Sequence, residues 1–198
     1  MSSYSTGAPG EPFRIPNYLV FDKEGNLYVS DSGEKDKNNG YVYKIPPGGG
    51  DGVVWHRTLA GFCNGLCLSP KGDYLYVILS FSEPRVVKVA IGPDGRAGAV
   101  ETVVEMPLTV PDGLAFDTEG NLYISCYRPD TIFRLTPQNE LQVLAEDYTG
   151  TLISAPTNIA FCGNERNIFL SSSFGQRHII RYELGTTGVS LNYPAIPL

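Results

Sequence analysis

Residues 111–125 read PDGLAFDTEGNLYIS, and three other stretches of the chain repeat this form. They are PNYLVFDKEGNLYVS at 16–30, CNGLCLSPKGDYLYV at 63–77 and PTNIAFCGNERNIFLS at 156–171, the most divergent copy. Each copy has a short polar residue, an apolar run, a turn that contains Gly or Asn, and a second apolar run. This order is typical of a β-hairpin, in which glycine supplies the left-handed conformation of a tight turn.

The hairpins recur with a regular period. Their leading polar residues, spaced 47, 48 and 45 residues apart, are Asn17, Asn64, Asp112 and Thr157. A repeat of this length built from strands indicates a β-propeller with one four-stranded blade per repeat. We therefore predict an all-β fold, a β-propeller with four recognisable four-stranded blades over residues 14–198, and a loop or remnant over residues 1–13. Equivalent residues of successive blades would then meet around one axis.

The remaining strands follow from the same repeat. Runs such as LYVILSF from Leu75 are apolar on both faces, which suits blades packed between neighbours. The stretch ELQVLAEDY from Glu140 contains good helix formers, but the repeat favours a strand there. In the fourth repeat we expect the last strand at Val189–Tyr193.

Composition excludes several classes of partner. The net charge is −6, and no cluster of Lys or Arg is present, so we expect neither nucleic acid nor anionic membrane as a partner. No run of eighteen apolar residues exists, and the start MSSYSTGAPGEP does not have the pattern of a signal peptide. The four cysteines lack metal-site spacing and are expected to be buried, reduced thiols. We therefore expect a cytoplasmic protein that acts on a small molecule.

Several phrases of the sequence, taken together, resemble one known family. They are NGLCLSPKGDYLYV at 64–77, VPDGLAFDTEGNLYISCYRPDTIFRLTP at 110–137, SAPTNIAF at 154–161 and LNYPAIPL at 191–198. At these residues the chain resembles the SMP-30/gluconolactonase/LRE-like family of six-bladed, calcium-dependent propellers. The resemblance covers 13–198 and implies that the chain lacks the first two blades of the family, including a blade that carries a glutamate ligand.

The resemblance also implies a site. Asn64 and Asp112 would bind one divalent cation, Ca²⁺ or a similar ion, in the axial channel. Asn17 would be a further ligand or a substrate contact, and Tyr18 stands where relatives have Asp. Calcium takes oxygen ligands of this kind, and a bound cation can polarise a lactone carbonyl. Asp112 would also help to activate water as a general base.

The family's activity implies a calcium-dependent hydrolase acting on a small ester, above all a sugar lactone. Tyr127 and Arg128 follow the second strand of the third blade and are expected to contact the substrate. His56 and His178 are expected to be structural, since neither has a partner in a recognisable nucleophile motif.

Three alternatives remain open from the sequence. The chain could be a non-catalytic or truncated propeller that serves as a binding scaffold of the NHL kind, or the same site could hydrolyse phosphotriesters. Asn and Asp at the leading positions could also merely cap turns, as these residues do in many loops. Two absent blades would leave apolar flanks uncovered, so self-association through these blade edges is expected.

Overall fold

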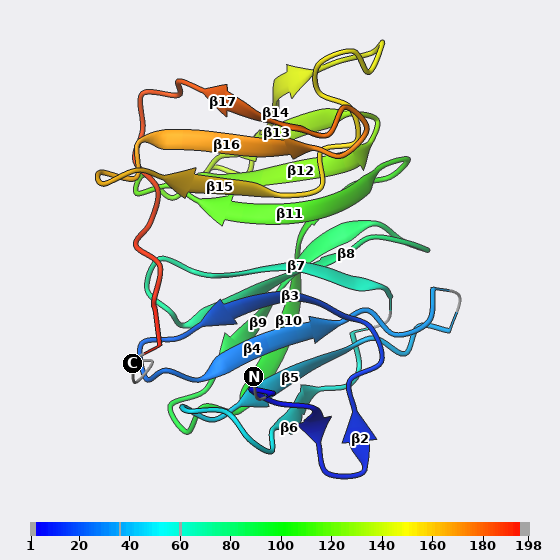
Figure 1. Cartoon of the computed structure of the whole chain (residues 1–198), viewed down its shortest axis with the longest axis vertical. Helices are drawn as coiled ribbons and strands as arrows, with labels where there is room; N and C mark the ends of the chain where they lie inside the picture. The colour runs from blue at the N-terminus through cyan, green and yellow to red at the C-terminus, as the bar shows by residue number, and fades with distance from the viewer. Residues whose placement is uncertain (1–2, 36, 60, 195–198) are drawn as a thin grey trace.

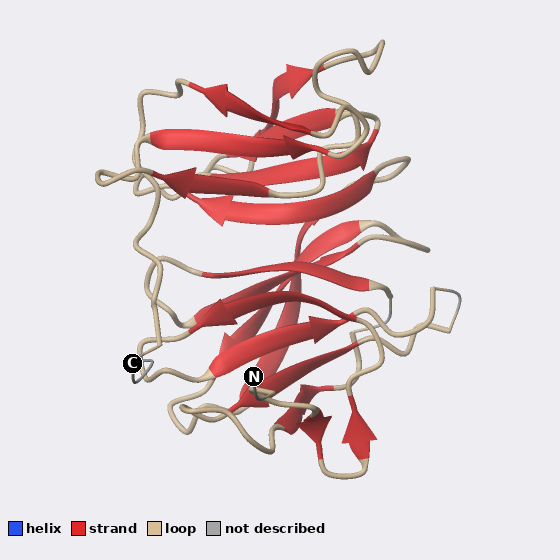
Figure 2. Cartoon of the chain, in the orientation of Figure 1, coloured by secondary structure: helices blue, strands red, loops and turns tan. Residues whose placement is uncertain are grey.

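A computed structural model describes residues 3–35, 37–59 and 61–194. Across these ranges the chain contains no helix, and therefore none of the length and apolarity that a membrane span requires. Figure 1 and Figure 2 show that the chain is built from strands and loops, arranged as successive twisted sheets. The predicted all-β propeller architecture is confirmed.

Each repeat forms one antiparallel blade with its first strand innermost. Blade 1 comprises β3 (Pro16–Phe21), β4 (Leu27–Asp31), β5 (Tyr41–Ile45) and β6 (Val53–His56). Blade 2 comprises β7 (Cys63–Leu68), β8 (Tyr74–Leu79), β9 (Arg85–Ile91) and β10 (Ala97–Glu105). Blade 3 comprises β11 (Val110–Phe116), β12 (Leu122–Arg128), β13 (Thr131–Leu135) and β14 (Leu141–Glu146). Blade 4 comprises β15 (Ile159–Cys162), β16 (Ile168–Ser173) and β17 (His178–Tyr182). The stretch from Glu140 thus contains a strand, β14, as predicted.

One expectation at the C-terminal end of the chain was wrong. The stretch Val189–Tyr193 forms no strand, so blade 4 has three strands among the described residues. Its polar groups bond elsewhere: the Val189 amide donates to the carbonyl oxygen of Phe116 (3.0 Å), and Asn192 Nδ2 donates to that of Phe21 (2.9 Å). The segment therefore crosses the turns of blades 3 and 1 instead of following β17. Residues 195–198, the end of the LNYPAIPL stretch, lie outside the described residues.

The expected N-terminal loop contains a two-stranded hairpin, formed by β1 (Gly7–Ala8) and β2 (Glu11–Pro12). Ala8 and Phe13 pack against the outer face of blade 1, on a buried cluster that contains Val29 and Tyr43. The N-terminal segment thus covers the flank of blade 1 that faces away from blade 2.

Turn chemistry explains why the inner hairpins form. In blade 1 the Asp22 carboxylate accepts a hydrogen bond from the Asn26 amide (2.8 Å), while Gly25 adopts a positive φ of 85°. Blade 3 repeats this arrangement with Asp117 and Asn121 (2.8 Å). Asp is favoured in such turns because its side chain can accept backbone hydrogen bonds. Asp22 and Asp117 are therefore structural residues of these turns.

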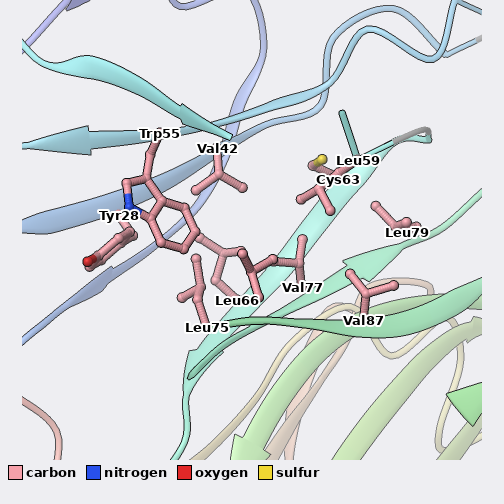
Figure 3. Close-up of a cluster of buried hydrophobic side chains, with 11 residues drawn as sticks. Tyr28, Val42, Trp55, Leu59, Cys63, Leu66, Leu75, Val77, Leu79 and Val87 are labelled. Atoms are coloured by element: carbon pink, nitrogen blue, oxygen red, sulfur yellow. The ribbon is translucent and has the colours of Figure 1, made fainter. Parts of the chain in front are cut away.

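The core lies between successive blades. Figure 3 shows the cluster between blades 1 and 2, where Tyr28 and Trp55 meet Leu66 and Val77. The rings of Tyr28 and Trp55 lie edge to face with centroids 5.1 Å apart. The Trp55 indole nitrogen donates to the carbonyl oxygen of Gly95 in blade 2 (2.9 Å). Similar clusters join blade 2 to blade 3 and blade 3 to blade 4.

A candidate cation site at the axis

The innermost strands β3, β7 and β11 place their leading polar residues at one end of the propeller axis. Asn17 and Asn64 are the second residues of β3 and β7, and Asp112 is the third residue of β11. β7 contacts both β3 and β11, and the arrows of β3, β11 and β15 point the same way in Figure 1. The predicted shared position of these three residues is therefore observed.

Glycine allows the inner strands to approach closely at this end. A Cβ atom on Gly65 would overlap the backbone oxygen of Asp112, and one on Gly113 would lie 2.9 Å from the backbone oxygen of Thr157. Only a residue without a side chain fits these contacts. The Asn-Gly and Asp-Gly pairs of the sequence thus combine a polar side chain with the close packing that brings it near the next blade.

Asn64 and Asp112 form a polar pair in which Asn64 is buried and Asp112 is half-buried. Asn64 is 5% exposed, and its Nδ2 donates to Ser80 Oγ (3.1 Å). Within the described chain, Asn64 Oδ1 is buried and has no hydrogen-bond partner. Burial raises the pKa of Asp112 to about 7, and hydrogen bonding from Asn64 acts in the opposite direction.

These two side chains fit a bound cation. A buried acceptor without a donor costs about 1–3 kcal/mol, and native proteins rarely leave one unpaired. A carboxylate whose pKa is raised by burial lacks compensating positive charge. A hard divalent cation would supply both a partner for Asn64 Oδ1 and a counter-charge for Asp112. No cluster of three or more His, Cys, Asp or Glu side chains occurs among the described residues, so amide oxygens are required.

Asn17 lies at the more exposed rim of the same end. Its Nδ2 donates to Ser32 Oγ (3.0 Å), as Asn64 donates to Ser80. The equivalent residue of blade 4, Thr157, shares a hydrogen bond with Ser172 Oγ (2.7 Å). The hydroxyl of Thr157 is therefore engaged within its own blade.

Tyr18 closes the axis beside this pair. Its hydroxyl donates to Asn158 Oδ1 in blade 4 (3.1 Å), and burial raises the pKa of the phenol, with Cys67 and Asp112 nearby. A cavity of about 270 Å³ lies between the four inner strands, and its lining includes Tyr18, Leu66 and residues 189–192 but neither Asn64 nor Asp112. Tyr18 thus borders a separate space along the inner strands.

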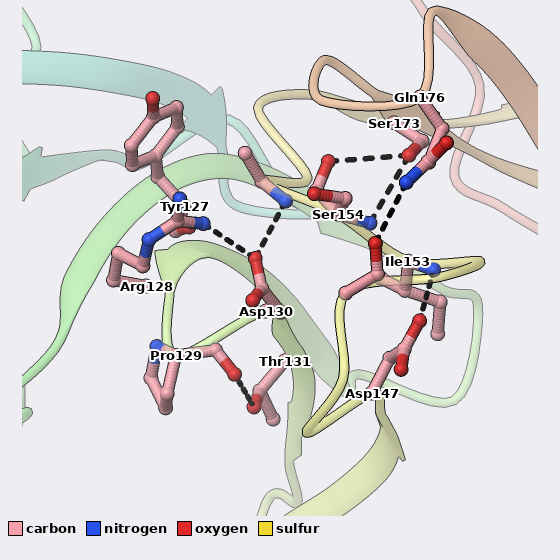
Figure 4. Close-up of polar contacts among 12 residues, drawn as sticks. Tyr127, Arg128, Pro129, Asp130, Thr131, Asp147, Ile153, Ser154, Ser173 and Gln176 are labelled. Atoms are coloured by element: carbon pink, nitrogen blue, oxygen red, sulfur yellow. Dashed lines mark hydrogen bonds and ion pairs between the residues drawn. The ribbon is translucent and has the colours of Figure 1, made fainter.

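Tyr127 and Arg128 line a hollow at the edge of blades 3 and 4. The hollow measures about 670 Å³ and is also lined by residues of blade 4 such as Phe174, and neither Asn64 nor Asp112 belongs to its lining. As Figure 4 shows, Arg128 is held by an ion pair with Asp130 (2.6 Å). Along the backbone the two residues lie opposite the start of β11, where Arg128 pairs with Val110 and Cys126 pairs with Pro111.

Histidine and cysteine play structural parts. His178 Nε2 lies 3.0 Å from the carbonyl oxygen of Leu152, and His56 Nδ1 accepts from the Thr58 amide (3.3 Å). All four cysteines are free, and burial raises the pKa of Cys63 and Cys126 to about 12. Such thiols are unreactive near neutral pH. Neither residue type forms part of the axial pair.

The sequence did not single out Ser32 or Ser80, which contact Asn17 and Asn64 directly. Ser32 and Ser80 follow the second strands of their blades at the same place, directly after Asp31 and Leu79. This shared position was a usable signal, but serine is too common at strand ends to be assigned a role without the structure.

One family model matches most of the chain. The family model described as the SMP-30/Gluconolactonase/LRE-like region matches residues 2–174. A gluconolactonase from Zymomonas mobilis is 28% identical over 200 residues, covering 90% of this chain and 53% of that protein. The chain therefore spans about half the length of this relative.

Solved structures share the fold. Regucalcin from Agrobacterium tumefaciens, a calcium-binding protein, superposes with a TM-score of 0.71 at 18% identity, covering 92% of this chain and 65% of that one. A gluconolactonase from Xanthomonas campestris gives a TM-score of 0.67 at 19% identity, covering 84% and 56%. With the match over residues 2–174, these findings show that the chain belongs to the SMP-30/gluconolactonase/LRE-like family.

Proposed function

We propose that the protein is a calcium-dependent hydrolase of a small ester, in particular a sugar lactone. The observation that carries this proposal is the axial pair, which combines the buried, unpartnered Asn64 Oδ1 with the half-buried carboxylate of Asp112, whose pKa is raised by burial. Support also comes from the names of relatives, since a gluconolactonase and a calcium-binding regucalcin match most of the chain. The chain spans about half the length of the gluconolactonase.

The proposed ligands are Asp112, Asn64 and Asn17. All three donate oxygen, which hard cations such as Ca²⁺ prefer over nitrogen or sulfur. Asp112 supplies the one negative charge of the set, and the two amides supply neutral oxygens. A single carboxylate makes a modest site, so we expect weaker binding than in sites with several carboxylates.

The chemistry follows from these residues. A divalent cation held by these three residues would polarise the ester carbonyl and favour attack by water. Asp112, the one carboxylate of the set, would accept the proton that the attacking water loses. Asn64 and Asn17 would hold the cation through their amide oxygens. Tyr127 and Arg128 would contact a part of the substrate remote from the ester, because they line a different hollow.

A lactone hydrolysis assay tests the proposal. The chain is stripped of metal with a chelator and assayed with δ-gluconolactone while calcium is added back. We expect hydrolysis above the spontaneous rate that saturates with calcium and is lost in Asp112→Asn. Calcium binding without hydrolysis would favour the scaffold alternative, and a phosphotriester substrate in the same assay tests the third alternative.

A further inference from the structure

We propose that Ser32 and Ser80 are positioning residues that hold the amides of Asn17 and Asn64 by their NH₂ groups and so leave the amide oxygens free to accept a cation. This inference rests on the proposed function and deepens it, because it explains how two neutral amides are prepared as cation ligands. Both serines are fully buried, with 0% exposure. Neither is proposed to touch the cation or the substrate.

The hydrogen-bond inventory of Ser80 determines the orientation of Asn64. Ser80 Oγ donates to the carbonyl oxygen of Pro111 (2.6 Å). A serine hydroxyl has one hydrogen, and a carbonyl can only accept, so this contact uses the donor of Ser80. The Asn64 atom that faces Ser80 Oγ at 3.1 Å must therefore be the NH₂ group. Asn64 Oδ1 therefore points away from Ser80. This oxygen is the buried atom of the axial pair that has no hydrogen-bond partner.

Blade 1 repeats the arrangement. Ser32 Oγ donates to the carbonyl oxygen of Cys63 (2.7 Å) and accepts from Asn17 Nδ2 (3.0 Å). The same count of donors places the Asn17 oxygen away from Ser32. Two successive blades thus orient their leading amide in the same way.

The accepting carbonyls link one candidate ligand to the next. Cys63 directly precedes Asn64, and Pro111 directly precedes Asp112. Each serine therefore joins the amide of its own blade to the ligand-bearing strand of the following blade. The three candidate ligands form one hydrogen-bonded series that runs from blade 1 through blade 2 to blade 3.

The serine occurs only where the leading residue is an amide. Backbone hydrogen bonds identify the equivalent positions, because each amide donates to the carbonyl oxygen two residues before the leading residue of its blade. The donors are Ser32, Ser80 and Phe174, and the acceptors are Ile15, Phe62 and Ala155. Blade 4 thus has Phe174 in this place. In blade 3 the residue before Asp112, Pro111, pairs with Cys126, so the equivalent position is the next residue, Tyr127. Blade 3 carries the carboxylate, and a carboxylate needs no such orientation because both of its oxygens accept.

Calcium titration calorimetry of the full chain tests this role. We expect Ser80→Ala to weaken calcium binding by about 10–100-fold, the usual cost of losing a residue that orients a metal ligand. Ser80→Cys keeps the size of the side chain but replaces the hydroxyl with a weak donor, so we expect a similar loss. Ser32→Ala should have a smaller effect, since Asn17 lies at the exposed rim.

Ser125→Ala is the matched control. Ser125 is also fully buried and also donates to a carbonyl of the next blade, that of Thr157 (3.1 Å), but it bonds no asparagine side chain among the described residues. We expect its unfolding temperature to fall as in Ser80→Ala while its calcium affinity stays near that of the parent. Equal losses of calcium affinity in the two variants would overturn the positioning role. They would mean that these serines only stabilise the contact between neighbouring blades.

A second measurement does not depend on calcium. In the metal-free parent, the side-chain NH₂ protons of Asn64 should exchange slowly with solvent by NMR, and this protection should be lost in Ser80→Ala. Rapid exchange in the parent would overturn the inference even if calcium binds. A parent that binds no calcium but protects these protons would overturn the proposed function and leave the orientation standing.

Discussion

The Tyr18 hydroxyl donates a hydrogen bond to Asn158 Oδ1 (3.1 Å), and this contact joins blade 1 to blade 4. The two residues are 140 positions apart in the chain and belong to different sheets. Burial raises the pKa of Tyr18, so the phenol remains a donor at neutral pH. The first and last blades are thus linked beside the candidate cation pair.

Tyr18→Phe should remove this link while keeping the ring. We expect a loss of about 0.5–1.5 kcal/mol in the free energy of unfolding, the usual net value of one hydrogen bond. Urea denaturation followed by the fluorescence of Trp55, the single tryptophan, measures it. The control is Tyr148→Phe at a fully exposed site. Equal stability of Tyr18→Phe and the control would mean that the contact contributes nothing.

Gly65→Ala should destabilise the contact between blades 2 and 3. Its methyl group would overlap the backbone oxygen of Asp112, which cannot rotate away as a side chain can. Overpacking of this kind costs about 1–3 kcal/mol, occasionally more. In Gly92→Ala the nearest atom is the movable Oδ1 of Asp94 (2.9 Å), so that variant should lose less. Thermal unfolding of both variants compares the two costs, and the reverse order would contradict the packing argument.

Asp112 should make the metal-free protein less stable at high pH. An unfolded Asp ionises near pH 4, whereas the folded group holds its proton to about pH 7. The folded state therefore binds more protons in this interval, and stability falls as the pH rises from about 4 to 7. Asp112→Asn should be more stable than the parent in chelator at pH 8, by a few kcal/mol at most, since each pKa unit corresponds to about 1.4 kcal/mol.

Urea unfolding at pH 5 and pH 8 checks this sign. The difference in the free energy of unfolding between Asp112→Asn and the parent should be smaller at pH 5 than at pH 8. Saturating calcium at pH 8 should make the parent the more stable of the two. A difference that is the same at both pH values would show that the folded pKa of Asp112 is close to its unfolded value.

Blade 4 should mediate self-association. Its outer flank exposes Ile179 (70%), whereas the N-terminal segment covers the corresponding flank of blade 1. Exposed apolar patches favour association, so we expect a dimer or larger species in sedimentation. Ile179→Lys should shift the protein toward monomer, and Leu108→Lys, at an exposed loop between blades, should not. A parent that sediments as a compact monomer would refute this expectation.

The repeat in the sequence predicted what depends on local pattern. The hairpin turns at Asp22 and Asp117 follow from turn chemistry, and the shared place of Asn64 and Asp112 follows from the period. Contacts between blades could not be predicted in this way. The bond from Ser80 to the Pro111 carbonyl depends on how two strands meet in space, which no local pattern records.

The same limit explains the error at the C-terminal end. Val189–Tyr193 has an apolar pattern suited to a strand, but its path is set by the turns of two other blades. The ring contact between Tyr127 and Phe174, with centroids 6.5 Å apart, likewise joins two blades and has no counterpart in the local sequence pattern.

The central claim is that Asp112 supplies the one negative charge of an axial calcium site. Calcium calorimetry at low salt of the parent and Asp112→Asn tests it most directly, because Asn keeps the shape and one oxygen but loses the charge. Removing a buried charged partner costs about 3–5 kcal/mol, so the variant should lose at least about 100-fold in affinity, more than Asn64→Ala or Asn17→Ala. Asp94→Asn, in an exposed turn, controls for net charge. We predict measurable binding by the parent that Asp112→Asn abolishes and Asp94→Asn retains, whereas equal binding by all three proteins would contradict the site.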